Sequence, residues 1–143
     1  MNQHCISRLT AGALVAICSF QFASAATSPL PPIQHSGDIT YLSGGIGSDQ
    51  SSAIKGVMRN YPLVLEFVGR TNSGNDYLAD VPVQISDTHG KNLFNVHTGG
   101  PFLLLSLPHG QYTVTAMYKG KVEHRTVDIT AATHAHEMFE WPM

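Results

Sequence analysis

The residues of this chain best suited to chemistry are its histidines, of which there are eight in 143 residues. His134 and His136 stand two apart in a segment whose alternation predicts a strand, so both imidazoles are expected on one face. His124 and Asp128 lie on the preceding predicted strand, from which they would face the pair across a hairpin. Imidazoles with a carboxylate bind zinc or copper, and the thioether of Met138 would favour Cu(I). The pattern therefore predicts, as one alternative, a copper or zinc site.

A plainer interpretation of the same segment is a strand with one solvated face. The histidine pair alternates with Ala135, Phe139 and Trp141. Such alternation arises whenever one face of a strand packs on a core and the other meets water. Because the sequence fixes no third ligand, both interpretations stay open.

Two other kinds of site lack the residues that they need. Gly44 to Gly47 precede a predicted helix whose free amides could bind a phosphate, but no Gly-Lys-Ser/Thr follows and Asp49 would repel an anion. A site for nucleophilic catalysis is not predicted either. No Gly-x-Ser-x-Gly elbow occurs, and both cysteines, Cys5 and Cys18, lie in the first 25 residues, which are expected to be removed. We therefore predict a turn at the glycines and no catalytic residues.

The first 25 residues have the pattern of a cleaved signal peptide. A basic start up to Arg8 is followed by the apolar run Leu9 to Phe20 and by the small residues Ala23-Ser24-Ala25. The apolar run is shorter than the roughly 20 residues that cross a bilayer. We predict cleavage after Ala25 and a periplasmic or secreted protein, whose mature part has no cysteine and hence no disulfide.

The remainder, residues 26–143, is long enough for one domain. It contains ten acidic and seven basic residues, a net charge of −3, and these are scattered along the chain. Nucleic acid and anionic lipid need a basic face, so neither is predicted as a partner, and no later segment is long enough to span a membrane. Residues 26–37, rich in Pro and Ser, predict a tether, and residues 38–143 predict the domain.

Apolar periodicity predicts one helix followed by strands. Apolar residues recur at helical spacing between Asp49 and Arg59, and Pro62 ends the run because the residue before a proline avoids helical geometry. From Leu63 onward, short alternating runs end at Gly, Asn, Asp or Ser about every 8 to 12 residues. We predict an all-β fold, an antiparallel β-sandwich of about seven strands with one short α-helix near the N-terminus.

The segment from Gly100 to Ala116 carries a resemblance to a known family. Its Gly-Pro-Phe-Leu-Leu and Leu-Pro-His-Gly-Gln-Tyr are expected to form two strands joined by a tight turn at Pro108 and Gly110. The segment resembles the carboxypeptidase regulatory-like domains of the transthyretin-like superfamily, in which this pattern marks a central hairpin. The resemblance covers roughly Leu78 to Trp141 and implies a transthyretin-like or Ig-like Greek-key sandwich.

Functionally, the resemblance implies an accessory or interaction module and carries over no catalytic residue. Transthyretin-like hydrolases share the fold class, but the chain ends in Phe-Glu-Trp-Pro-Met instead of their Tyr-Arg-Gly-Ser. The predicted function is a non-enzymatic, exported binding module that contacts an envelope protein or a surface polymer. A periplasmic copper- or zinc-binding protein and a hydrolase are the alternatives.

Apolar residues on both faces of one predicted strand require a second cover. If Phe102 and Leu104 face the core, then Leu103, Leu105 and Met117 point away from it. The apolar stripe of the predicted helix also needs a partner, so we expect the helix to cover these residues. Otherwise they form a surface for a partner.

Overall fold

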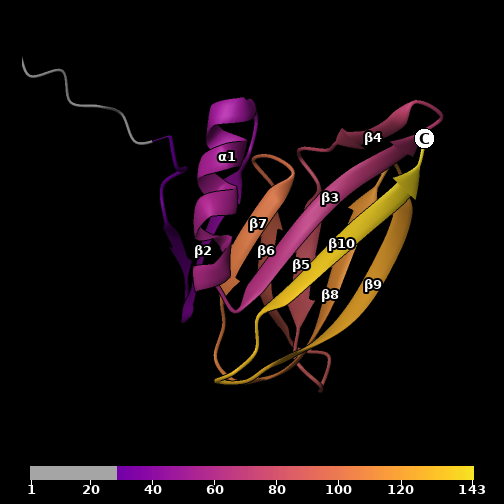
Figure 1. Cartoon of the computed structure of the whole chain (residues 1–143). Helices are drawn as coiled ribbons and strands as arrows, with labels where there is room; N and C mark the ends of the chain where they lie inside the picture. The colour runs from indigo at the N-terminus through magenta and orange to yellow at the C-terminus, as the bar shows by residue number, and fades with distance from the viewer. Residues whose placement is uncertain (1–28) are drawn as a thin grey trace, which may run out of the picture.

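The computed structural model describes residues 29–143 and consists of two β-sheets packed face to face, with a helix on the outside of one (Figure 1). The predicted all-β sandwich with one short helix is confirmed for this part of the chain. The predicted signal peptide, the cleavage site after Ala25 and the two cysteines lie outside the described residues. None of the described helices is long and apolar enough to cross a membrane.

Sheet A has six strands in the described chain, in the order β1-β2-β7-β3-β10, with β4 paired to β3. Its strands are β1 (Gln34–Ser36), β2 (Ile39–Gly44), β3 (Leu63–Thr71), β4 (Gly74–Tyr77), β7 (Phe102–Ser106) and β10 (Ala135–Pro142). Sheet B has four, in the order β6-β5-β8-β9. Its strands are β5 (Pro82–Ser86), β6 (Asn92–His97), β8 (Gly110–Tyr118) and β9 (Lys121–Ile129).

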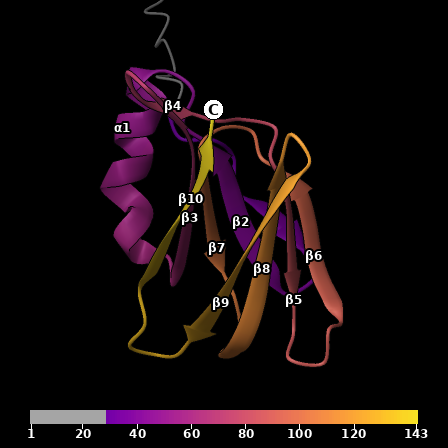
Figure 2. The same ribbon diagram turned by 90° about the vertical axis from the view of Figure 1, so that its right-hand side faces the viewer.

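The helix α1 (Ser48–Val57) continues as a short 3-10 turn, η1 (Met58–Asn60), close to the predicted bounds. It lies on the outer face of sheet A, and the opposite face of that sheet meets sheet B (Figure 2). Under the helix, Ile54 packs with Leu42, Val64, Phe102 and Leu104. The helix therefore gives sheet A a second apolar layer.

The core between the sheets is formed by alternate residues of every long strand. Its largest members are the rings of Phe67, Phe139 and Trp141, which stack on one another with centroids 5.5 to 6.4 Å apart. The residues alternating with them face outward. This alternation is the pattern from which the strands were predicted.

The strand count and one pairing differ from the prediction. The described chain has ten strands instead of about seven, and β10 runs parallel to β3, with Ala135 opposite Leu63. The described part of the segment expected to be a tether belongs to the fold, because Pro31 is buried and β1 pairs with β2. A Cβ on Gly44 would lie 2.5 Å from Pro31 Cγ, so the glycine makes room for this segment.

The predicted hairpin at Pro108 and Gly110 is wrong. β7 belongs to sheet A and β8 to sheet B, so the turn carries the chain from one sheet to the other. The predicted orientation of the β7 side chains is also reversed. Leu103 and Leu105, which were expected to point away from the core, are fully buried between the sheets.

Phe102 and Leu104 are the residues of β7 that the helix covers. The helix does cover one face of β7, as predicted, but this is the face of Phe102 and Leu104 and not that of Leu103 and Leu105. Leu103 and Leu105 therefore form no partner surface. Met117, the third member of that predicted surface, is 40% exposed and lines a groove on sheet B.

Candidate functional site

His136 lies on the helix side of sheet A and contacts a buried carboxylate. Its Nε2 is 3.0 Å from Oε2 of Glu66, which stands on the neighbouring strand β3. The Glu66 side chain is only 10% exposed, whereas that of His136 is 38% exposed. An ionised carboxylate only accepts hydrogen bonds, so next to it the imidazole donates from Nε2.

His134 is held in a similar way just before β10 begins. Its Nδ1 is 2.9 Å from the backbone oxygen of Tyr61, and because a carbonyl oxygen only accepts, Nδ1 is the donor. Tyr61 itself packs against the apolar cluster under the helix. The neutral ring of His134 then has its lone pair at Nε2.

The structure does not bring His124 and Asp128 to this pair. Both stand on β9 in sheet B, where Nδ1 of His124 is 2.9 Å from the Thr115 hydroxyl and Asp128 accepts from the Gln111 side chain at 3.1 Å. In residues 29–143, no group of three or more His, Cys, Asp or Glu side chains could hold a metal ion. The four residues of the predicted metal site thus lie on two different sheets.

The glycine loop before the helix is occupied by a side chain of the chain itself. The Oε1 atom of Gln50 accepts hydrogen bonds from the amides of Gly45 at 2.7 Å and Ile46 at 3.3 Å. Those amides are the donors that a phosphate would need. The predicted turn is therefore a structural element that anchors the start of α1.

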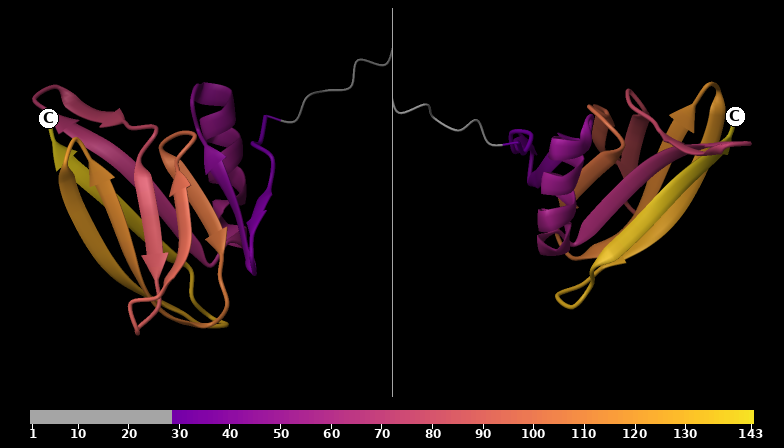
Figure 3. Two further views of the ribbon diagram at one scale, coloured as in Figure 1. Left: turned by 180° about the vertical axis from the view of Figure 1, so that it is seen from behind. Right: turned by 45° about the horizontal axis from the view of Figure 1, so that its top comes forward.

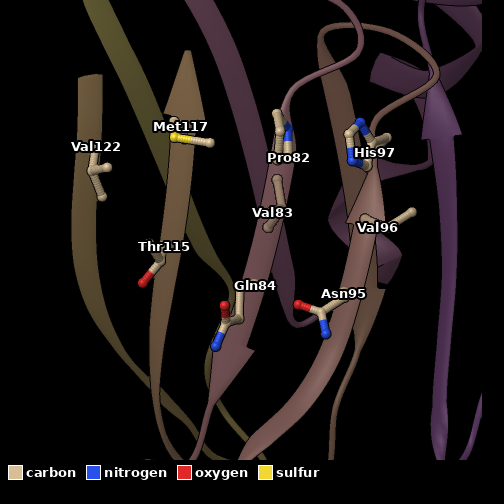
Figure 4. A pocket seen from close by; sticks show the side chains of 9 residues that line it. All are labelled: Pro82, Val83, Gln84, Asn95, Val96, His97, Thr115, Met117 and Val122. Atoms are coloured by element: carbon tan, nitrogen blue, oxygen red, sulfur yellow. The ribbon is translucent and has the colours of Figure 1, made fainter. Parts of the chain in front are cut away.

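Sheet B carries a groove on the face turned away from sheet A. No described helix or strand crosses this face, as the view from behind in Figure 3 shows. The groove has a volume of about 450 Å³ and crosses all four strands. Its nine lining residues, drawn in Figure 4, are Pro82, Val83, Gln84, Asn95, Val96, His97, Thr115, Met117 and Val122.

Register arranges the outward side chains of the groove in two rows across the strands. Asn95 on β6 is opposite Gln84 on β5, which is opposite Thr115 on β8. This polar row continues to His124 on β9, the register partner of Thr115. A carboxamide both donates and accepts hydrogen bonds, as does a hydroxyl. The first row can thus form hydrogen bonds with both donors and acceptors of a ligand.

The second row lies two residues away from the first on each strand and is mostly apolar. His97 is opposite Pro82, and Met117 is opposite Val122. Met117 is 40% and Val122 is 47% exposed. Among the described residues that line the groove, none is Asp, Glu, Lys or Arg. The one lining imidazole, that of His97, has its Nδ1 3.1 Å from Oδ1 of Asp80. The groove therefore combines a polar and an apolar side and is lined by no Lys or Arg.

Sequence reasoning missed Glu66 and the polar row. Glu66 is a lone carboxylate in the apolar run Leu63 to Val68, which was the available signal for a buried acid with a partner. Gln84 and Asn95 had no such signal, because polar residues on the wet face of a strand are the ordinary case. Their alignment depends on strand pairing.

No family model matches the chain, and no curated protein matches it. Among solved structures, the chain is similar to the Bacillus anthracis TIE protein, with a TM-score of 0.35 and 17% sequence identity. The match covers 57% of this chain and 16% of that one, so the chain spans a small part of that protein's length.

Proposed function

We propose that the chain is a non-enzymatic, exported binding module of the cell envelope whose ligand lies in the groove on sheet B. Export rests on the signal-peptide pattern of residues 1–25. The observation that carries the binding proposal is the pair of rows, one polar and one apolar, on a face that no described element covers. Its volume falls in the range of ligand sites, about 300 to 1,000 Å³.

The ligand that fits this groove best is a neutral, hydroxyl-rich polymer. Amide and hydroxyl side chains in the first row can bond to hydroxyl groups, and Pro82, Met117 and Val122 can pack against C–H surfaces. An anionic polymer would find no Lys or Arg among the lining residues, and the His97 imidazole already contacts the Asp80 carboxylate at 3.1 Å. The energetic centres of protein interfaces are rich in Trp, Tyr and Arg, and the described lining has none of these.

The proposal is tested with residues 26–143 and a panel of insoluble neutral polysaccharides, with heparin and polygalacturonate as anionic polymers. We expect retention on at least one neutral polymer. Retention should change little with added salt, because screening acts on charges and no Asp, Glu, Lys or Arg lines the groove. A co-sedimentation assay at low and high salt measures both properties.

The decisive variants change the polar row. Gln84→Ala with Asn95→Ala should weaken retention at least tenfold, whereas Gln111→Ala, on the same sheet but outside the groove, should leave it unchanged. Binding only to anionic polymers, or equal effects of the two sets of variants, would contradict the proposal. Capture of an envelope protein that depends on Gln84 and Asn95 would replace the polymer by a protein partner.

A further inference from the structure

The polar row of the groove has one hydrogen-bonding side chain on each strand of sheet B. Asn95, Gln84 and Thr115 follow one another on β6, β5 and β8, as Figure 4 shows. His124 continues the row on β9, where its Nδ1 is 2.9 Å from the Thr115 hydroxyl. The imidazole therefore borders the groove, and in either tautomer its Nε2 can form a further hydrogen bond.

The backbone sets the spacing of this row. Neighbouring strands of a sheet lie about 4.8 Å apart, so the side chains recur at roughly that interval along a line that crosses the strands. In the described chain sheet B has four strands, so the row has four positions and spans about 14 Å between its ends. The apolar row runs beside it at about 7 Å, because the two rows are two residues apart on each strand.

We propose that the groove binds one extended chain of β-linked sugar rings that runs along the polar row, with one ring on each strand. This ligand rests on the function proposed for the groove and defines its class more narrowly. A β-linked glycan such as cellulose is almost straight, and each ring advances the chain by roughly the distance between two strands. Its hydroxyl groups can bond to the polar row, while its C–H surfaces pack on Pro82, Met117 and Val122.

A coiled or a charged glycan fits this face less well. In an α-linked chain such as amylose, each ring turns relative to the last, so successive rings leave the line of the polar row. No Lys or Arg lines the groove to bind a uronic acid or a sulfate group, and the His97 imidazole already contacts the Asp80 carboxylate at 3.1 Å. Both the linkage and the charge of the ligand should therefore affect binding.

The test is a calorimetric titration of residues 26–143 with oligosaccharides of two to six rings. The β-linked series are cello-, xylo- and chito-oligosaccharides, and malto-oligosaccharides are the α-linked control. For at least one β-linked series, we expect the affinity to rise about fivefold per ring up to four rings, the gain that one net hydrogen bond typically gives. Longer chains should gain little more, because the described chain has no fifth strand in sheet B.

Variants along the row locate the chain on the sheet. Any three consecutive rings must cover Gln84 on β5, so Gln84→Ala should weaken the binding of three and of four rings alike, by about fivefold. His124 lies at one end of the row, so His124→Ala should abolish only the gain from three to four rings. Thr126→Ala is the matched control, because Thr126 is two residues from His124 on the same strand and outside the row.

Three results would overturn this ligand class while the binding function of the groove stands. They are equal affinity for α-linked and β-linked chains, a gain that ends at two rings, and equal effects of His124→Ala and Thr126→Ala. Retention on an insoluble neutral polymer without binding of any β-linked series would overturn it as well. No retention on any neutral polymer would overturn the proposed function itself. Thermal melts verify the fold of each variant, whose substituted side chains are all exposed.

Discussion

The burial of Tyr112 should lower the stability of the domain as the pH becomes alkaline. It is 7% exposed, and its hydroxyl donates to the Pro108 carbonyl at 2.7 Å. Burial raises the pKa of Tyr112 above the ordinary value of 10.0. The unfolded chain therefore loses this proton first, and the contribution of Tyr112 to stability falls as pH rises from 10.0 through the folded-state pKa.

We expect Tyr112→Phe to lose about 1 kcal/mol of stability near neutral pH, because one hydrogen bond disappears. Above the ordinary tyrosine pKa the variant should lose less further stability than the parent, since it has no phenol to ionise. Urea unfolding over a pH series measures both effects. Two stability curves that stay parallel through the alkaline range would show that Tyr112 does not contribute.

Side-chain positions were predictable along a strand and not across strands. The alternation in β10 correctly placed Phe139 and Trp141 in the core and His136 on the other face. The partners of His136 could not be predicted, because Glu66 is 70 residues away in sequence and reaches it only through strand pairing. In β7 every residue from Phe102 to Leu105 is buried, so alternation was lost and the face assignment was inverted.

At the scale of elements, the close approach of two segments depends on Gly100. A Cβ at this position would lie 2.4 Å from the backbone carbon and oxygen of Gly44 at the end of β2. Because the obstacle is backbone, Gly100→Ala should cost about 1 to 3 kcal/mol, as overpacking typically does. Gly56→Ala is the matched control, since it lies in α1 with nothing within 4 Å of the new methyl group.

The control should gain about 0.5 to 1 kcal/mol, because alanine is a better helix former than glycine. Thermal melts of the two variants should therefore shift in opposite directions. Equal stability of Gly100→Ala and the parent would show that the segment before β7 relaxes freely, and the contact with β2 would then have no structural importance.

Long elements were predictable from the sequence, and short exposed ones were not. The helix and the strands from β5 to β10 could be predicted because their apolar residues recur at a regular spacing, which reflects burial on one side. β4 is exposed at all four residues, and β1 contains three residues with none buried. Neither leaves an apolar pattern, because neither strand buries a residue although each pairs with a neighbouring strand.

At the scale of the whole molecule, the sandwich was predictable from the sequence, but the pairing of its last strand, β10, was not. Regularly spaced strands indicate two sheets, but only tertiary structure shows that β10 returns to lie parallel to β3. This return places β10 of sheet A beside β9 of sheet B. Nε1 of Trp141 on β10 donates to the backbone oxygen of Lys121 on β9 at 3.1 Å, so the indole links the two sheets.

Trp141→Phe should weaken both sheets together. The variant loses the hydrogen bond and part of a fully buried ring that packs on Phe67 and Phe139, a cost of about 1 to 3 kcal/mol. If the sandwich opens as one cooperative unit, slow hydrogen exchange at Leu65 in β3 and at Val114 in β8 should accelerate by the same factor. Val122→Ala, on the exposed face of β9, should change neither rate. Faster exchange at Leu65 alone would mean that sheet B keeps its structure when sheet A opens.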